Sequence, residues 1–130
     1  MNTRHHVPWG ILYLLLSALA GCRTAPIYNV AGAPITTPRP VEMVDIQNAI
    51  VRAGAGLGWA MKPVTPGHLI GTLHIRNHTA VVDILYNPRS YDITYKDSVN
   101  LKQAGGEIHK NYNAWIQNLD HAIKMQLSGL

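Results

Sequence analysis

Cysteine, charge runs and long apolar stretches are all scarce in this chain of 130 residues. Cys22 is the only cysteine, so no disulfide bond can form within the chain, and a folded domain has to be held by its hydrophobic core alone. The net charge of +4 comes from scattered residues with no basic run, which argues against nucleic acid as a partner. No internal repeat or low-complexity tract is visible.

The longest apolar run covers residues 7–20 and is shorter than the roughly 20 residues that a helix needs to cross a bilayer. It follows a short polar start that carries Arg4, and it ends in the small residues Ala20 and Gly21. A weakly positive start, a short apolar middle and small residues at the end are typical of a signal peptide. We therefore predict that residues 1–21 are an export signal.

The tetrapeptide Leu19-Ala20-Gly21-Cys22 resembles the lipobox of bacterial lipoproteins. The resemblance implies that a lipid is attached to the Cys22 thiol, that the signal is cut before this residue and that the new amino group is acylated. Several acyl chains give stable anchoring, since each buried methylene contributes about 0.8 kcal/mol. No free thiol then remains for catalysis or metal binding. The alternative is an ordinary signal peptide or a membrane anchor with a chance cysteine.

The residue after the lipobox bears on which membrane holds the protein. In lipoproteins of this type an aspartate there often favours retention in the inner membrane, whereas this chain has Arg23. The resemblance therefore implies anchoring in the outer membrane, on the periplasmic face.

Residues 22–40 hold the lipidated cysteine and a proline-rich segment that we expect to act as a tether. Its prolines are Pro26, Pro34, Pro38 and Pro40. Proline lacks a backbone donor and fixes φ, so we expect neither a regular helix nor a central strand here. A proline-rich chain extends by about 3.1 Å per residue, so the segment could reach on the order of 50 Å. Four apolar residues leave open whether part of it lies against the domain: Ile27, Tyr28, Val30 and Ile35.

Residues 41–130 are long enough for one small core but not for two, and we expect them to form one α+β periplasmic domain. Residues 41–57 are predicted to form a helix because apolar residues recur at spacings of three and four. These residues are Met43, Ile46, Ile50, Ala53 and Leu57. Pro40 suits the start of this helix, and three nearby glycines weaken its end.

Four strands are predicted next, over residues 59–62, 69–76, 79–86 and 90–97. Short turns separate them, and strands joined by short turns are antiparallel neighbours. We therefore predict an antiparallel β-meander of three to four strands.

The register of these strands is predicted from burial. With Asn77-His78 as a two-residue turn, Leu73 faces Val82, and in the next strand pair Val82 faces Tyr95. Apolar residues then gather on one face, and a shift by one residue would mix the two faces. Polar residues gather on the other face: Thr72, His74, Arg76, Asp83, Asp92, Thr94 and Lys96. Asn-His lacks the glycine that a tight turn prefers, so a longer loop is the alternative.

Residues 107–127 are predicted to form the last helix. Its apolar stripe consists of Ile108, Tyr112, Trp115, Leu119, Ile123 and Leu127. Two helices and a sheet, each apolar on one face, predict a two-layer α+β sandwich in the order helix, meander, helix. We expect Trp59, Tyr95 and Trp115 to be the large side chains that dominate its core.

No arrangement typical of catalysis or metal binding is visible. Five histidines follow Cys22 without the spacing of a metal site: His68, His74, His78, His109 and His121. Ser98 and His109, with Asp97 nearby, are the only tempting pair for nucleophilic catalysis, but no nucleophile elbow surrounds Ser98. The seven acidic residues form no recognisable acid–base pair. We therefore predict that the protein is not an enzyme and uses neither a cofactor nor a metal.

Three motifs carry a second resemblance: Gly58-Trp59, Tyr-x-Asp-Ser-x-Asn-Leu over residues 95–101, and His-x-x-Tyr-Asn-x-Trp over residues 109–115. They resemble a family of small proteobacterial lipoproteins of unknown function, with the lipobox and the proline-rich tether in matching order. The family has no established activity to carry over. Five polar residues of these motifs could line a patch where the last strand meets the last helix: Asp97, Ser98, Asn100, His109 and Asn113. The alternative is hydrogen bonding within loops and caps.

Two functions follow as hypotheses. The first is a non-catalytic lipoprotein, anchored through Cys22, that binds another component of the cell envelope. The second is a small-ligand binding module at the end where the last strand meets the last helix, which predicts a concave pocket there.

Overall fold

The computed structural model describes residues 23–130. The predicted signal peptide and the lipidation of Cys22 fall on residues 1–22, so they lie outside the described residues and stay predictions. Within residues 23–130, neither α-helix is both long and apolar enough to cross a membrane.

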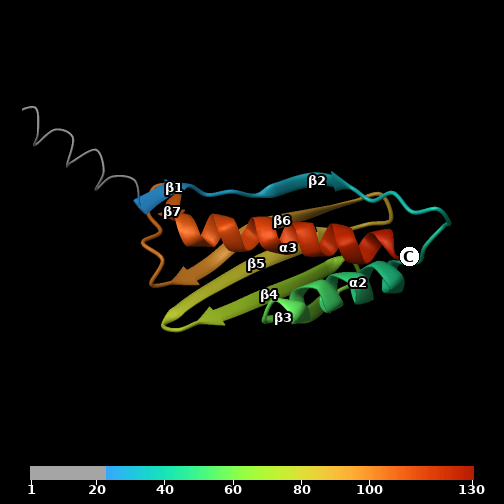
Figure 1. Ribbon diagram of the computed structural model, residues 1–130, viewed down its shortest axis with the longest axis horizontal. Helices are drawn as coiled ribbons and strands as arrows, with labels where there is room; N and C mark the ends of the chain where they lie inside the picture. Colours follow the sequence, from blue (N-terminus) through green and yellow to red (C-terminus); the bar gives the residue numbers. More distant parts are fainter. Residues whose placement is uncertain (1–22) are drawn as a thin grey trace, which may run out of the picture.

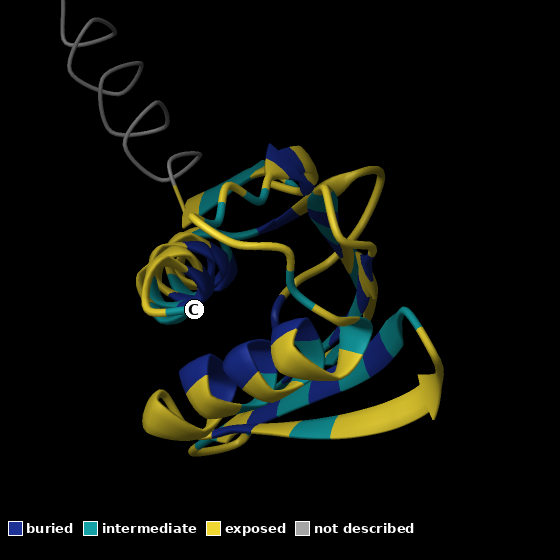
Figure 2. Ribbon diagram, turned by 90° about the vertical axis from the view of Figure 1, so that its right-hand side faces the viewer, coloured by how far each residue is buried: buried dark blue, intermediate teal, exposed yellow. Residues whose placement is uncertain are grey.

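An antiparallel five-stranded sheet, with the strand order β2-β6-β5-β4-β3, forms the frame of the fold (Figure 1). A second sheet pairs β1 with β7. The strands are β1 (Thr24–Pro26), β2 (Val30–Pro34), β3 (Trp59–Thr65), β4 (His68–Ile75), β5 (His78–Tyr86), β6 (Ser90–Val99) and β7 (Glu107–His109), and the helices are α2 (Met43–Gly56) and α3 (Lys110–Ser128). Both helices lie on the concave side of the curved sheet (Figure 2). The α+β class is confirmed, and the sheet has more strands than the predicted layout of helix, meander and helix.

Helix α2 forms where the apolar spacing predicts it. The Asp45 carboxylate accepts a hydrogen bond from the Glu42 backbone amide at 3.1 Å, as part of a capping box at the first turn. The buried face consists of Ile46, Ala49, Ile50, Ala53 and Gly54. Gly58 follows the helix with a φ of 89°, a conformation that favours glycine, and turns the chain into β3.

The meander is confirmed as β3 to β6, and one of its two predicted registers is wrong. Val82 pairs with Tyr95 as predicted, but Leu73 pairs with Ala80 instead of Val82. The reason is the β4–β5 turn, which consists of Arg76 and Asn77, with Arg76 at a φ of 56°. The pairing moves by two residues, and because side chains alternate with a period of two, the same face still points to the core.

Part of the segment predicted to be a tether lies against the domain, which is one of the two alternatives that the sequence left open, and it contains β1 and β2. Strand β2 is an edge strand that pairs with β6, and its residues Val30 and Ala33 are buried. Pro26 and Pro34 end the two strands, where a missing backbone donor is tolerated. Among residues 23–130, the packed body therefore includes β1 and β2 as well as residues 41–130.

Helix α3 begins three residues later than predicted. Residues 107–109 instead form β7, in which Ile108 pairs with Ala25 and is fully buried. His109 then caps α3, because its Nδ1 accepts a hydrogen bond from the Asn111 backbone amide at 3.2 Å. Of the rest of the stripe, Tyr112, Leu119, Ile123 and Leu127 are buried as predicted, and Trp115 is partly buried.

The core is a single cluster, but two of its three predicted aromatic residues are only partly buried. Trp59 is buried, whereas Tyr95 and Trp115 lie at the margin. Tyr91 and Tyr112 are the largest fully buried side chains instead. Tyr95 stays at the margin because its hydroxyl group bonds the Ser98 hydroxyl group at 2.8 Å.

Candidate functional site

The two ends of the body form two separate candidate surfaces. The anchor-side end comprises Arg23, the β4–β5 turn and residues 100–111, and it lies where β1 and β7 meet (Figure 1). The far end comprises the β3–β4 turn, the β5–β6 turn and residues 35–45. Strands β4, β5 and β6 run the length of the body between them.

Asn113, one of the five predicted patch residues, holds the N-terminal segment in place with two hydrogen bonds. Its Oδ1 accepts a hydrogen bond from the Tyr28 backbone amide at 3.0 Å, and its Nδ2 donates to the Pro26 carbonyl at 2.9 Å. The side-chain amide therefore bonds the segment in the way that a neighbouring strand would. This geometry matches the alternative of structural hydrogen bonding.

The other four patch residues bond to separate partners. Ser98 bonds the hydroxyl group of Tyr95, Asp97 accepts from the Ser98 backbone amide at 2.8 Å, and the Asn100 carbonyl accepts from Nδ1 of His78 at 2.7 Å. His109 Nδ1 is occupied by its capping bond. Ser98 and His109, the tempting catalytic pair, are thus each bonded to a different group. Within residues 23–130, no group of three or more His, Cys, Asp or Glu side chains is placed to hold a metal.

Two further side chains bond the N-terminal segment to β6: Asn29, which the sequence analysis did not name, and Asp92, which it placed on the polar face. Asn29 Oδ1 accepts from the Tyr95 backbone amide at 2.9 Å, and Asp92 Oδ1 accepts from the Gly32 backbone amide at 2.6 Å. Each bond joins residues more than 50 positions apart along the chain. No periodicity accompanies such bonds, so the sequence holds no pattern that would find them.

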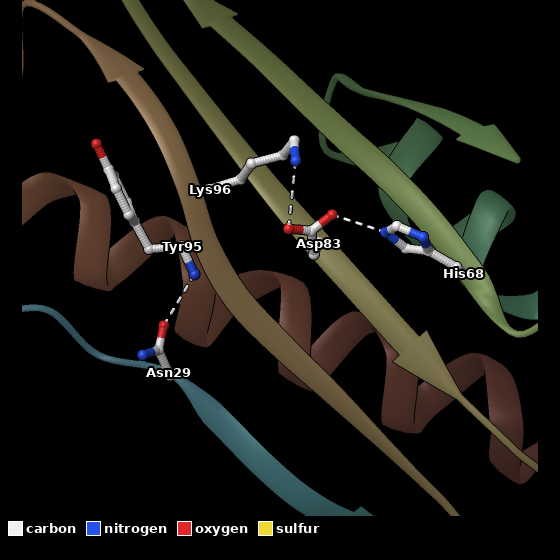
Figure 3. A network of polar contacts seen from close by, with 5 residues as sticks. All are labelled: Asn29, His68, Asp83, Tyr95 and Lys96. Atoms are coloured by element: carbon white, nitrogen blue, oxygen red, sulfur yellow. Dashed lines mark hydrogen bonds and ion pairs between the residues drawn. The ribbon is translucent and has the colours of Figure 1, made fainter. Parts of the chain in front are cut away.

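The outer face of the sheet carries a small ionic network, shown in Figure 3 together with the bond between Asn29 and Tyr95. Asp83 Oδ1 lies 2.7 Å from His68 Nε2, and its Oδ2 lies 3.7 Å from Lys96 Nζ. The prediction that Asp83 and Lys96 lie on the polar face agrees with this placement. Ion pairs this open to solvent contribute about 0–1 kcal/mol to stability.

A buried polar group lies under the sheet. Tyr91 donates to Asp120 Oδ1 at 2.5 Å, and Lys124 Nζ lies 3.0 Å from Asp120 Oδ2. Burial, and then the hydrogen bond to Asp120, raise the pKa of Tyr91 far above its ordinary value. Burial, and then the neighbouring Tyr95, raise the pKa of Tyr112 in the same direction. Among the described residues, the Tyr112 hydroxyl group is the buried side-chain polar atom that finds no hydrogen-bond partner.

An apolar groove of about 410 Å³ opens at the far end. Its lining comes from the first turns of α2, the end of β3, the β3–β4 turn and the end of β5: Met43, Val44, Gln47, Pro63, Val64, Thr65, Pro66 and Tyr86. Val44 and Val64 are 52% and 48% exposed, which is high for valine. Tyr86 donates to Gln47 Oε1 at 3.0 Å and so holds α2 against β5.

A second hollow of about 60 Å³ lies between Trp59 and Trp115. None of the five predicted patch residues lines either hollow. The groove at the far end is the larger of these two hollows, and it lies at the end opposite the predicted patch.

Comparison with known proteins gives no relative from which a function could be carried over. No family model matches the chain, and neither the curated proteins nor the solved structures contain a significant match.

Proposed function

We propose that this protein is a non-catalytic lipoprotein, anchored through Cys22 on the periplasmic face of the outer membrane, that binds another protein of the cell envelope. The lipobox and the preceding apolar run support the anchor. The groove at the far end carries the proposal of binding. A binding role fits better than catalysis because Ser98 and His109 bond to other groups.

The groove suits an apolar segment of a protein. It exposes Val44 and Val64 to solvent, and its apolar walls would gain free energy by burying an apolar side chain of a partner. A small-molecule site usually encloses most of its ligand, whereas this groove is open along one side. Lys62 and Pro63 interrupt the free edge of β3, so the partner would rest its side chains in the groove instead of adding a strand.

Photo-crosslinking from the groove tests this proposal. A photoreactive side chain at Val64 in the full-length protein should crosslink one envelope protein in intact cells, identified by mass spectrometry. Val44→Glu should abolish that crosslink, since a carboxylate would have to be desolvated against apolar surface. The matched control is Met125→Glu on the outer face of α3, at a residue that is 62% exposed, and it should leave the crosslink intact.

Three other results would contradict the proposed partner. A crosslink only between two copies of this chain would make the groove a dimer contact, and a crosslink only to a small molecule would make it a ligand site. Equal crosslinking in Val44→Glu would remove the groove from the interface. Mass spectrometry of the native N-terminus tests the anchor separately, because an uncut signal or an unmodified Cys22 would overturn it.

A further inference from the structure

We infer that the anchor-side end is a membrane-contact surface that binds anionic phospholipid headgroups and holds the body end-on at the bilayer, with the groove facing away from it. This inference rests on the proposed lipidation of Cys22. It adds an orientation and a second binding surface, which anchoring through a tether would not require.

The pairing of β1 removes the freedom that a tether would have. Thr24 pairs with His109, and Ile27 donates its backbone N–H to the Gly106 carbonyl at 2.9 Å. Asn113 clamps the same segment. Only Arg23 separates Cys22 from the first paired residue, and a residue spans at most about 3.6 Å. A lipid on Cys22 would therefore hold the anchor-side end within about two residue lengths, roughly 7 Å, of its attachment point.

The charge of the body is concentrated at this end. Four basic residues there are exposed: Arg23, Arg76, Lys102 and Lys110. Asp97 and Glu107 are the acidic residues nearby, which leaves +2. At the far end, Arg39 and Arg89 are balanced by Glu42 and Asp45. Anionic headgroups attract Lys and Arg only within about a Debye length, near 10 Å, so the short connection to the anchor is what brings these charges into range.

Two of these basic residues, Arg76 and Lys102, have an unusual backbone conformation. Arg76, Asn100 and Lys102 are the three non-glycine residues of the described chain with positive φ, at 56°, 62° and 54°. Asparagine tolerates this conformation, but lysine and arginine rarely adopt it. Leu101 is buried between Asn100 and Lys102, and its carbonyl accepts from the His109 backbone amide at 2.8 Å, which fixes the loop. Two basic side chains thus occupy loop positions that would suit glycine, and residues in such strained conformations cluster at functional sites.

Site-specific probes in vesicles test the inference with the lipidated full-length protein. If Cys22 is lipidated, a cysteine introduced by Gln103→Cys at the anchor-side end, or by Thr36→Cys at the far end, offers the only free thiol. Each variant is labelled with a fluorophore and reconstituted in vesicles of phosphatidylethanolamine and phosphatidylglycerol that carry a headgroup quencher. The probe at residue 103 should be quenched far more than the probe at residue 36.

Charge-matched variants separate contact from simple anchoring. Arg76→Gln, Lys102→Gln and Lys110→Gln together should remove the excess quenching, with the contact equilibrium falling about fivefold for each residue neutralised. The control combines Lys62→Gln, Arg39→Gln and Arg89→Gln, which removes the same charge elsewhere and should keep the excess. Replacing phosphatidylglycerol by phosphatidylcholine should lower the quenching at residue 103 only.

Equal quenching of the two probes in a lipidated protein would overturn the membrane-contact surface while leaving the anchor intact. The same conclusion would follow if the variant with Arg76→Gln, Lys102→Gln and Lys110→Gln showed the same excess quenching at residue 103 as the protein without these three substitutions. A mass spectrum that showed an unmodified Cys22 would overturn the proposed anchor, and the inference with it.

Discussion

The anchor-side end and the far end are both made of short turns, yet they expose opposite chemistry. The first carries a net excess of basic residues on loops held by Asn113 and the buried Leu101, and the second carries balanced charges around an open apolar groove. Charge acts on a headgroup surface over several ångströms, whereas an apolar groove needs a partner in direct contact. One small core can therefore present two surfaces that suit different partners.

The buried tyrosine hydroxyl groups also differ between the two ends of the body. Tyr91, paired with Tyr86 near the β5–β6 turn, has its hydroxyl group satisfied by Asp120. Tyr112, in the first turn of α3 at the other end, has a buried hydroxyl group without a partner.

Tyr91→Phe should lower the free energy of unfolding by about 2 kcal/mol, because hydrogen bonds to charged groups contribute about 1.5–3 kcal/mol and Asp120 would lose a donor. Tyr112→Phe should leave it unchanged within about 0.5 kcal/mol or raise it, because that hydroxyl group makes no bond that could be lost. Urea denaturation followed by circular dichroism measures both. Equal losses in the two variants would show that the two hydroxyl groups are not in different environments.

Alkaline pH should destabilise the protein through the same two tyrosines. Their pKa is raised in the fold above the ordinary value of 10.0, so above that pH the unfolded chain releases protons that the folded chain keeps. The free energy of unfolding should fall by about 1.4 kcal/mol per pH unit for each tyrosine, and this loss should be absent below pH of about 9.

Denaturation between pH 9 and pH 11 checks this slope, and Tyr112→Phe should halve the part due to the two buried tyrosines. Ultraviolet absorbance of the folded protein supplies the control. If both side chains ionised near pH 10 while the fold remained intact, their burial would not be controlling the titration.

Asn113→Ala should lower the global stability by only about 1 kcal/mol, since the two bonds it removes lie near solvent. Its main effect should be local: hydrogen exchange at the Tyr28 amide should become faster, and the segment after Cys22 should behave as the tether that its prolines predict. In the vesicle experiment the probe at residue 103 should then lose part of its quenching. Asn111→Ala, an exposed residue two positions away, is the matched control and should change neither measurement.

Lys102→Gly should have the smallest effect on stability, and in the opposite direction. Glycine adopts the positive φ of this position without the cost of about 1–2 kcal/mol that other residues carry, and its extra freedom in the unfolded chain cancels part of the gain. We expect a net stabilisation of about 0.5 kcal/mol together with weaker membrane contact.

The reverse change is Gly105→Ala, at a φ of 59° where an added Cβ would meet nothing within 4 Å. It should cost about 1 kcal/mol through the backbone alone. A loss of stability in Lys102→Gly would show that the lysine side chain stabilises the fold, which would remove the argument for a role of this residue at the membrane.

Most of the predicted elements form because their patterns are local. Helix α2 follows from apolar residues repeating every three or four positions, and the β5–β6 pairing follows from a short turn with apolar residues on both sides. The β4–β5 register was wrong because Arg76 adopts a positive φ that its residue type does not suggest. The predicted patch residues come from the end of β6, the following loop, β7 and α3, and their hydrogen bonds hold loops and the N-terminal segment together.

The N-terminal segment could not be predicted for a different physical reason. Its four prolines argue against regular structure, and that argument holds for the middle of a sheet but not for its edge. The exposed side of β6, together with Asn29 and Asp92, makes an edge position available to β2, and β1 pairs with β7 beside the bonds of Asn113.

Local patterns in the sequence predict the α+β class, the apolar faces of both helices and of the meander, and an anchor at Cys22, because each depends on residues close together in the chain. Tertiary structure alone decided that the predicted tether becomes β1 and β2, that basic residues collect beside β1, and that a groove opens at the other end. Those features depend on contacts between residues far apart in the chain, whose free energy exists only after the sheet has closed around the two helices.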